Sequence, residues 1–592
     1  MTNTDTSDII KLKIKNTFPD GCRRILLVNV PQVSEADFDI SSARAGKNVC
    51  FPPYGLGLLS RGLHNSHYIS DIIDLNFEML SSVSNPSFDY DRFWKEILVK
   101  KIESFKPDLI GISCMFSMTH DFLEIASFYL KEHYPRIPII VGGVHVSNNT
   151  RLILEQVSQI DFALRYESDE ALISLIDYIN GKVQQDFLGQ ISFVQDGEYH
   201  ELNNRMIPAN EILDLSPDYG ELPIGEYSKR GRIGGFSWLR PDRPKFGTIL
   251  AHRGCRGKCT FCSVSSFNGK GVRSRNIKAV VDEMQRTSEI YDIKHFMWLD
   301  DDLFGRNAIE LFNEMTCRNL GITWDATNGV IAAASTPEMI HAAAESGCIA
   351  LVFGIESGDP DILRSVGKPS KVKQFRTVGE TLKKYPQIFS KGNLMIGFPG
   401  ETVGQIQKTM DLALEIEMDW YMITAVSFLG GTKMTEKLIE EGKLDEADSL
   451  RAANFSVSPN GTRNKKELAE KSVSTFSPDI LKGDPKRIPT PEELPDIWFL
   501  MDCLLNFCPI LKEERSVKLA MKSLMLREIC ERVPEHALAR LFLGVINRKL
   551  GLLDIAKNNF LETEKILNTS AFWKVRFEQL GIDKILAEEC SS

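Results

Sequence analysis

Residues 251–262 read AHRGCRGKCTFC and place three cysteines, Cys255, Cys259 and Cys262, on one short segment. The segment follows an apolar run at residues 246–250 that we expect to form a buried strand. Three thiolates on a glycine-containing loop can bind three corners of a cubane iron–sulfur cluster, which leaves one iron free to bind a substrate or cofactor. A structural zinc site would need a fourth Cys or His at a recognisable spacing nearby. We therefore predict a [4Fe–4S] cluster with these three cysteines as its ligands.

Three basic residues lie within the same segment, at Arg253, Arg256 and Lys258. Positive charge beside a thiol favours its deprotonated form, and the thiolate is the form that binds a metal. We therefore expect these side chains to help the cysteines ionise and to offset the charge of a reduced cluster.

The chain beyond this segment continues to alternate apolar runs with helical patterns. The runs recur at residues 246–250, 296–299, 350–353, 393–396 and 422–426. Their spacing of about thirty to fifty residues leaves room for a helix between successive strands. We predict that residues 246–452 form a full or partial (β/α) barrel, with its active-site face at the carboxyl ends of the strands.

A second alternating series precedes the barrel, with apolar runs at residues 25–30, 70–75, 109–113 and 138–143. Continuous apolar strands separated by helices are typical of a parallel sheet that is covered on both faces. We predict a doubly wound, Rossmann-like domain at residues 22–195, with ligands at the carboxyl ends of its strands. The predicted fold class is α/β for both sheet domains.

The remaining segments carry weaker patterns. We assign residues 1–21 to an N-terminal extension, 196–245 to a linker, 453–494 to a linker or cover, and 495–592 to a helical domain. Within that domain, residues 537–567 resemble a tetratricopeptide helix pair. Because repeat arrays usually need about three units, two interpretations stay open, a cap packed on the barrel or a surface for a protein partner.

The composition is that of an ordinary globular chain. Its 80 acidic and 70 basic residues give a formal net charge of −10, which offers no general binding surface for nucleic acid. No apolar run approaches the roughly 20 residues that span a bilayer, and the first residues are polar and acidic, unlike a targeting signal. Twelve cysteines in 592 residues are too sparse for a disulfide scaffold. We expect a cytoplasmic protein without a membrane span.

The cysteine segment resembles that of a known family. Its Cys-x-x-x-Cys-x-x-Cys spacing, with Phe261 before the last cysteine and a predicted barrel strand in front, resembles the radical S-adenosylmethionine (SAM) superfamily. The resemblance implies that the open iron chelates the amino and carboxylate groups of SAM. One electron then cleaves SAM into methionine and a 5′-deoxyadenosyl radical, which abstracts hydrogen from a substrate. Phe261 is itself a candidate for a SAM contact.

Later strand ends resemble those of the same superfamily. Asp300 and Asp301 follow the second apolar run, where an acidic pair commonly lies near SAM. Glu356 ends a further strand, where a carboxylate can accept hydrogen bonds from ribose hydroxyls. Gly397 and Pro399 resemble the adenine-side strand end. The resemblance makes all five residues candidates for SAM contacts.

A doubly wound domain directly before such a barrel resembles the cobalamin-binding subfamily. The segments PPYGLGLL (52–59), SCMFS (113–117) and GGVH (142–145) carry the resemblance, since small residues after strands let a large flat ligand approach the backbone. The resulting candidates for cobalamin contacts are Ser113, Ser117, Gly142, Gly143 and His145. The alternative is a plain flavodoxin-like domain whose glycines serve turns.

Three segments depart from the family pattern. The Asp-x-His-x-x-Gly segment that supplies the lower cobalt ligand in methionine-synthase-like domains does not occur, so the lower face is either open or filled by another residue. Residues 166–170 read YESDE where the subfamily often has Gly-Glu-Gly-Glu, so Glu167 is only a possible contact. Residues 428–432 read FLGGT in place of a common Pro-Gly-Thr pattern, and we expect the substrate side to be reshaped there.

The resemblance implies a C-methyltransferase acting on an unactivated carbon of a small-molecule or natural-product substrate. One SAM would methylate the cobalamin, and a second would supply the radical that activates the substrate. Relatives in the subfamily also perform oxidative cyclisation and ring rearrangement without methyl transfer, and a non-catalytic cofactor sensor or assembly factor is a second alternative. The mechanism requires an electron donor of the flavodoxin or ferredoxin type. The sequence does not name the substrate.

Overall fold

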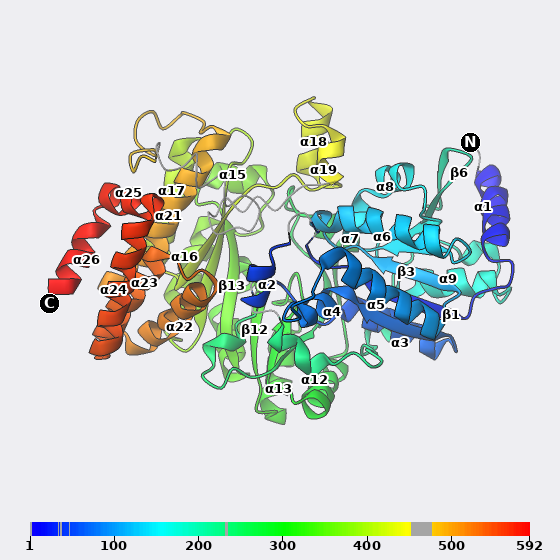
Figure 1. Ribbon diagram of the computed structural model, residues 1–592, viewed down its shortest axis with the longest axis horizontal. Coiled ribbons are helices and arrows are strands. Elements are labelled where there is room, and N and C mark those ends of the chain that lie inside the picture. Colours follow the sequence, from blue (N-terminus) through cyan, green and yellow to red (C-terminus); the bar gives the residue numbers. More distant parts are fainter. Residues whose placement is uncertain are drawn as a thin grey trace.

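The computed structural model describes residues 3–591 except 34, 36–37, 47, 231–234 and 451–475. Three parts follow one another along the long axis of the molecule (Figure 1). The N-terminal sheet lies at one end, a second sheet lies in the middle, and the C-terminal helices lie at the other end. The predicted fold class is confirmed, since two α/β parts are followed by a helical part.

The N-terminal sheet has seven strands in the order β2-β1-β3-β4-β5-β6-β7. Strands β1 to β5 run parallel, and β6 and β7 are added antiparallel at one edge. The strands are β1 (Arg24–Asn29), β2 (Ile69–Asp74), β3 (Leu109–Ser113), β4 (Ile139–Gly142), β5 (Phe162–Leu164), β6 (Ile191–Gln195) and β7 (Glu198–Glu201). Strand β7 lies within the residues that we assigned to a linker, because its polar sequence carries no apolar run.

Helices cover both faces of this sheet. In β1, Ile25 and Leu27 join one hydrophobic core, whereas Leu26 and Val28 join the other. The first face is covered by α1 (Asn3–Thr17), α3 (Tyr54–Asn65) and α9 (Asp169–Ile179), and the second by α4 (Leu75–Ser82), α5 (Tyr90–Phe105), α6 (His120–His133) and α8 (Thr150–Gln156). The predicted doubly wound arrangement is therefore confirmed.

The middle sheet has six parallel strands in the order β15-β14-β13-β12-β11-β8. The strands are β8 (Phe246–Ile249), β11 (His295–Trp298), β12 (Thr323–Val330), β13 (Cys348–Glu356), β14 (Phe389–Ile396) and β15 (Trp420–Ala425). Within the described part of the chain, β8 and β15 do not pair with each other, so the sheet is a partial barrel. Strand β12 is not among the apolar runs that the sequence shows.

Five helices between these strands pack on the outer face of the partial barrel. They are α12 (Ile277–Tyr291), α13 (Ala308–Arg318), α14 (Pro337–Glu345), α16 (Val372–Leu382) and α17 (Val403–Ile416). Helix α16 packs closely on α17 at Gly379, where a Cβ atom would lie 2.8 Å from the carbonyl oxygen of Ile416. The strand ends are thus held at fixed positions by a shell of helices.

The C-terminal helices pack on the open edge of the partial barrel. They are α21 (Leu494–Asp502), α22 (Ser516–Arg532), α23 (Ala537–Lys549), α24 (Leu553–Thr569), α25 (Ala571–Leu580) and α26 (Ile582–Ser591). The Trp498 indole donates to the carbonyl of Ile423 at 2.9 Å, and the Asn506 amide pairs with both backbone groups of Tyr421, at 2.7 and 2.8 Å. These contacts replace the missing neighbour of edge strand β15.

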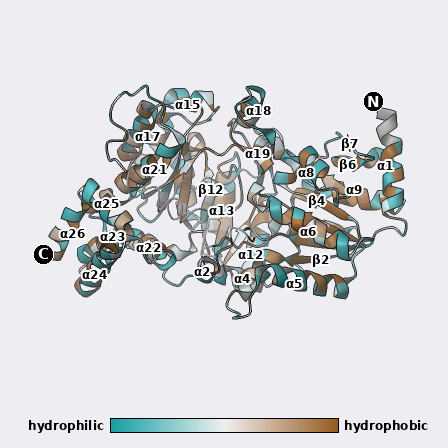
Figure 2. Ribbon diagram, turned by 45° about the horizontal axis from the view of Figure 1, so that its top comes forward, coloured by the Kyte–Doolittle hydropathy of each residue, from teal (hydrophilic) through white to brown (hydrophobic). Residues whose placement is uncertain are grey.

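One helical stretch, Pro491–Lys512, is long and apolar enough to cross a membrane by length and composition. We did not expect such a stretch, and 56% of its apolar window is buried inside the protein. Figure 2 shows hydrophobic residues along α21 and the strands beside it. The apolar character of this stretch is thus explained by its packing against β15.

The predicted tetratricopeptide-like pair corresponds to α23 and α24. A Cβ atom at Gly544 would lie 2.7 Å from Cδ1 of the Phe560 ring, so the two helices interlock at this glycine. The cover predicted for residues 453–494 lies partly outside the described residues, which resume at 476.

Candidate active site at the facing strand ends

The three cysteines lie together above the partial barrel. Cys255 ends β9 (His252–Cys255), which pairs with β10 (Gly271–Ser274), and Cys259 and Cys262 follow in the loop before α11 (Val264–Asn268). All three side chains are partly exposed. A Cβ atom at Gly257 would lie 3.3 Å from the Cys255 sulfur and 3.7 Å from the Cys259 sulfur. Glycine at this position therefore leaves space beside the two sulfurs.

Backbone hydrogen bonds hold the cysteine loop on both sides. Thr260 N donates to Val366 O at 2.9 Å, and Met434 N donates to Thr260 O at 2.9 Å. In the described part of the chain, no three His, Cys, Asp or Glu side chains converge on a point that could hold a single metal ion. Thiolates that each bind a separate iron of a cubane need not converge in this way. The three cysteines thus fit a cluster better than a mononuclear site.

The charge around the cysteines differs from the expectation. Arg253 forms two hydrogen bonds with Asp169, at 2.7 and 2.9 Å, and Arg256 forms two with Asp302, at 2.6 and 2.8 Å. Burial raises the pKa of the Cys255 and Cys262 thiols to about 11. Partner carboxylates therefore offset the positive charge of both arginines, while Arg256 still interacts favourably with the charge of a Cys255 thiolate. That the basic residues promote thiolates stays a prediction.

Lys368 is a further cation that acts on the cysteines, at Cys259 and Cys262. It lowers the pKa of the Cys259 thiol, although burial outweighs it and the net shift is upward. Its ammonium group lies 2.8 Å from the Glu356 carboxylate. Sequence inspection missed Lys368 because it lies outside every motif.

Glu356 occupies a special backbone conformation at the end of β13. Its φ of +63° lies in the left-handed region, which is uncommon for a residue with a side chain. A Cβ atom at Gly354 would lie 2.6 Å from the Glu356 carboxylate and 2.7 Å from the Lys368 ammonium. Because residue 354 has no side chain, the Glu356 carboxylate and the Lys368 ammonium group can lie over the strand at that position. The role of Glu356 at the ribose stays a prediction.

The three aspartates after β11 have different surroundings. Asp300 is buried and accepts hydrogen bonds from Ala251 N, at 3.0 Å, and from His252 Nδ1, at 2.8 Å. Asp301 is partly exposed, and burial followed by the two neighbouring aspartates raises its pKa to about 7. Asp300 therefore ties β11 to the cysteine segment, and Asp301 is the more exposed of the two. SAM contacts of both aspartates stay predictions.

The end of β14 folds back toward the cysteine loop. Gly397 has a φ of +81°, and its N–H donates to the Glu401 carboxylate at 2.7 Å. Pro399 is exposed, and the ring of Phe398 lies 6.1 Å from that of Phe261. The structure thus brings Phe261 close to the end of β14. SAM contacts of Phe261, Gly397 and Pro399 stay predictions.

The cobalamin candidates lie at the ends of β3 and β4. Ser113 and Gly142 are neighbours in the sheet and are partly exposed. Gly143 has a φ of +114°, and a Cβ atom there would lie 2.8 Å from the carbonyl carbon of Cys114. Met115 and Phe116, which sequence inspection did not single out, are 47% and 45% exposed. Small strand ends beside exposed apolar side chains fit a large flat macrocycle.

His145 belongs to a buried hydrogen-bonded network behind these strand ends. Its Nδ1 atom lies 3.1 Å from the Ser117 hydroxyl, and its Nε2 atom lies 3.1 Å from His120 Nδ1. Burial, followed by His120, lowers the pKa of His145 to about 3. The imidazole of His145 is therefore neutral. The residue is only 2% exposed. Direct cofactor contacts of Ser117 and His145 stay predictions.

The two sheet domains meet at these strand ends. A Cβ atom at Gly430 would lie 2.9 Å from Cγ of Asn149, which follows α7 (Val144–Asn148). Glu167 forms hydrogen bonds of 2.5 and 2.7 Å with Arg273 of β10. The glycines of the FLGGT segment thus permit contact between the domains, and Glu167 binds the second domain.

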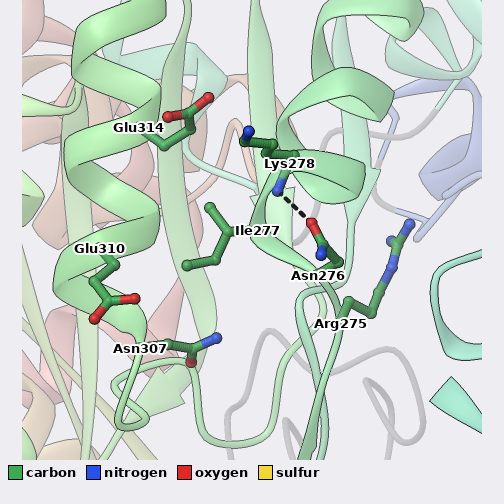
Figure 3. A pocket seen from close by; sticks show the side chains of 7 residues that line it. All are labelled: Arg275, Asn276, Ile277, Lys278, Asn307, Glu310 and Glu314. Atoms are coloured by element: carbon green, nitrogen blue, oxygen red, sulfur yellow. Dashed lines mark hydrogen bonds between the residues drawn. The ribbon is translucent and has the colours of Figure 1, made fainter.

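A separate open cavity of about 610 Å³ lies beside α12 and α13. Figure 3 shows Glu310 and Glu314 on one side and Lys278 on the other. Asn276 caps α12 by accepting a hydrogen bond from Lys278 N at 2.9 Å. None of the three cysteines lines this cavity.

Both sheet domains match models of known protein families. The radical SAM superfamily matches residues 249–413, and the B12 binding domain matches residues 47–176. An uncharacterised methyltransferase of Pyrococcus horikoshii is 27% identical over 66% of this chain and 80% of its own length. The cytidylyl-2-hydroxyethylphosphonate methyltransferase of Streptomyces wedmorensis is 25% identical, with coverages of 71% and 84%. The anaerobic magnesium-protoporphyrin IX monomethyl ester cyclase of Rubrivivax gelatinosus is 23% identical, with coverages of 69% and 72%.

Two solved structures share the fold. The radical SAM methyltransferase TsrM of Kitasatospora setae matches with a TM-score of 0.56 and 16% identity, over 71% of this chain and 76% of that one. The cobalamin-dependent SAM radical enzyme OxsB matches with a TM-score of 0.56 and 16% identity, over 95% of this chain and 84% of that one. With a B12 binding domain that precedes a radical SAM domain, this chain belongs to the cobalamin-binding radical SAM enzymes.

Proposed function

We propose that this chain is a cobalamin-dependent radical SAM C-methyltransferase that acts on an unactivated carbon of a small molecule. The observation that carries the proposal is the contact between α7, which follows β4, and α11, which follows the cysteine loop. The Ser266 hydroxyl of α11 donates to Asn148 Oδ1 of α7 at 3.1 Å across the domain interface. Two methyltransferases that cover 80% and 84% of their own lengths are among the relatives, which supports methyl transfer.

Each cofactor has residues that suit it. Cys255, Cys259 and Cys262 would hold the cluster, and Glu356 would accept hydrogen bonds from SAM. Ser113, Gly142 and Gly143, with the apolar pair at residues 115–116, would hold the corrinoid. When bound, the cluster supplies the electron that cleaves SAM to its radical, and cobalamin carries a methyl group. The chain itself would hold these groups on the two sides of the domain interface.

The Glu356–Lys368 pair has a defined task in this proposal. Lys368 holds the carboxylate of Glu356 at the end of β13, and Gly354 leaves room for both side chains. A ribose hydroxyl can then donate to an oxygen whose position is already fixed. We expect the pair to order the carboxylate before SAM binds.

A second candidate function keeps both cofactors and transfers no methyl group. The relative from Rubrivivax gelatinosus, a magnesium-protoporphyrin IX monomethyl ester cyclase, favours this alternative. A non-catalytic sensor or assembly factor would not need a complete set of cluster cysteines. For all three functions we infer a cytoplasmic location, and for both enzymatic ones a flavodoxin or ferredoxin type electron donor.

Anaerobic reconstitution tests the proposal. The protein is loaded with iron, sulfide and hydroxocobalamin, reduced in the presence of SAM, and analysed by mass spectrometry for 5′-deoxyadenosine and S-adenosylhomocysteine. We expect both products, and we expect neither from the matched Cys255→Ala variant. 5′-Deoxyadenosine without S-adenosylhomocysteine would favour the non-methylating function. Full biological activity of a folded Cys255→Ala variant would contradict both enzymatic functions.

A further inference from the structure

The concave face of β14 carries polar side chains that the proposed cofactor sites do not use. On the opposite face, a Cβ atom at Gly392 would lie 2.8 Å from both Ile355 and Tyr421, and the Tyr421 hydroxyl donates to Ala413 O of α17. That face therefore packs on the helices. Since successive strand residues alternate between faces, Lys391 and every second residue of β14 on either side of it line the interior of the partial barrel.

These interior residues form a row that leads to the cysteine loop. Phe389 begins the row, with its ring packed on Phe236. Lys391 and Asn393 follow, and Met395 ends the row in a hydrophobic cluster with Phe261. With about 3.3 Å of rise per residue, Lys391 lies roughly 13 Å along the strand from Met395. A molecule that reaches from Lys391 toward Met395 would thus approach the predicted SAM site.

Solvent reaches the interior at the level of this row. Met422 of β15 is the direct partner of Asn393 in the sheet and shares its face. It is 43% exposed, whereas its neighbours Tyr421 and Ile423 are buried. The concave face is therefore open to small solutes beside Asn393.

The Lys391 ammonium group has no hydrogen bond or ion pair with a described residue. Asp325 of β12 is the carboxylate whose charge raises the pKa of Lys391. Its oxygens already accept hydrogen bonds from Phe236 N at 2.8 Å and from His295 Nε2 at 2.8 Å. Thr327 N also donates to Asp325, at 3.0 Å. A cation held in this way lacks a counter-ion, and an anionic ligand would supply one.

Asn393 is the second unused group. Its side-chain oxygen Oδ1 is buried and has no hydrogen-bond partner among the described residues. Buried polar atoms are normally paired with a protein, water or ligand group, so an unpaired oxygen points to a missing donor. Asn393 lies two residues from Lys391 on the same face, about 7 Å away along the strand.

We propose that Lys391 and Asn393 anchor the substrate, with Lys391 binding a carboxylate or phosphoryl group and Asn393 accepting a hydrogen bond from a hydroxyl or amine of the same molecule. The proposal rests on the proposed function, because it names the chemical class of that small-molecule substrate. The anionic end lies deep in the barrel, and the opposite end extends toward the cysteine loop and the cobalamin domain.

The titration of Lys391 agrees with this assignment. Burial lowers its pKa to about 8, and Asp325 offsets only part of the effect. The sheet neighbours of Lys391, Val352 and Trp420, carry no charge, and the ring of Phe236 packs against its ammonium group. An anion would raise this pKa and reduce the neutral-amine fraction, about fivefold at pH 8 for a rise of one pKa unit.

Chemical labelling of the reconstituted full-length protein tests the anion site without turnover. A neutral amine-reactive succinimidyl ester is applied briefly at pH 8, and mass spectrometry compares Lys391 with the exposed Lys373 of α16 in the same sample. We expect millimolar inorganic phosphate or acetate to slow labelling of Lys391 about fivefold and to leave Lys373 unchanged. Stronger protection by one of the two anions identifies the phosphoryl or the carboxylate class.

Two results would overturn the proposal. One is equal labelling of Lys391 with and without both anions, and the other is no labelling of Lys391 at any pH, since a substrate could not reach the amine. Protection in a protein that forms 5′-deoxyadenosine but no S-adenosylhomocysteine would contradict the proposed methyl transfer and leave the anion site standing. For Asn393, the Asn393→Leu variant should keep protection by inorganic phosphate and lose the additional protection that glycerol 3-phosphate gives. Equal glycerol 3-phosphate protection in both proteins would remove Asn393 from the site.

Discussion

Replacing Gly143 by alanine should weaken cobalamin binding without affecting the cluster. A Cβ atom at this position would lie 2.8 Å from the carbonyl carbon of Cys114, whereas carbon atoms in favourable contact lie about 3.5 to 4.0 Å apart. The turn after β4 must then move by roughly 0.7 Å or more away from β3. This movement separates Gly142 from Ser113, the two strand ends on which we expect the corrinoid to lie.

The magnitude follows from the cost of crowding. Forcing an extra carbon into a packed site costs about 1 to 3 kcal/mol, and 2 kcal/mol corresponds to a roughly thirtyfold loss of affinity. Gly181 provides a control for a β-carbon at a positive φ, because its φ is +70° and its Cβ position is open. Gly143 itself, with φ +114° and ψ 175°, lies in a region that is essentially restricted to glycine, so Gly143→Ala adds both backbone strain and the collision.

The assay is equilibrium binding of hydroxocobalamin, followed by absorbance, with iron content measured on the same samples. We expect Gly143→Ala to bind the corrinoid roughly thirtyfold more weakly than Gly181→Ala, with equal iron content in both. Equal corrinoid affinity in the two variants would refute the reasoning and remove this turn from the cobalamin site.

Three further changes test other parts of the site. Cys259→Ala should abolish the visible absorbance and iron content of the reconstituted cluster, and a full cluster spectrum would refute its assignment as a ligand. Glu356→Gln should weaken SAM binding by about 1 to 3 kcal/mol in equilibrium dialysis, whereas unchanged affinity would remove it from the SAM site. Because the pKa of Lys391 is lowered from 10.5 to about 8, its charge destabilises the fold below pH 8, and this cost disappears as pH rises toward 10.5. Lys391→Met should therefore raise the melting temperature at pH 7 by more than at pH 10, and an equal change at both pH values would contradict the buried charge.

Local motifs made the cofactor regions predictable from the sequence. The cysteine segment and the strand ends at residues 113–117 and 142–145 carry their signals within a few neighbouring residues. The continuous apolar runs revealed five of the six barrel strands for the same reason. Strand β12 was not predicted because it places Asp325 and Thr327 on the concave face, and these polar residues interrupt its apolar run.

Tertiary contacts explain what the sequence could not reveal. The partners of Arg253 and Arg256 lie 84 and 46 residues away, so their neutralisation is invisible in the motif. Lys368 and Lys391 likewise acquire their roles from strands that the fold brings beside them. Strand β7 lacks an apolar run because pairing with β6 at the sheet edge, rather than complete burial, places it in the sheet.

The most direct test of methyl transfer follows the methyl group itself. The reconstituted protein is incubated under reducing conditions with SAM that carries a ¹³C-labelled methyl group, and the released corrinoid is analysed by mass spectrometry together with S-adenosylhomocysteine. We expect the label to appear on the corrinoid bound to this chain, with a matching amount of S-adenosylhomocysteine. An unlabelled corrinoid beside abundant 5′-deoxyadenosine would contradict this expectation and assign the chain to radical chemistry without methyl transfer.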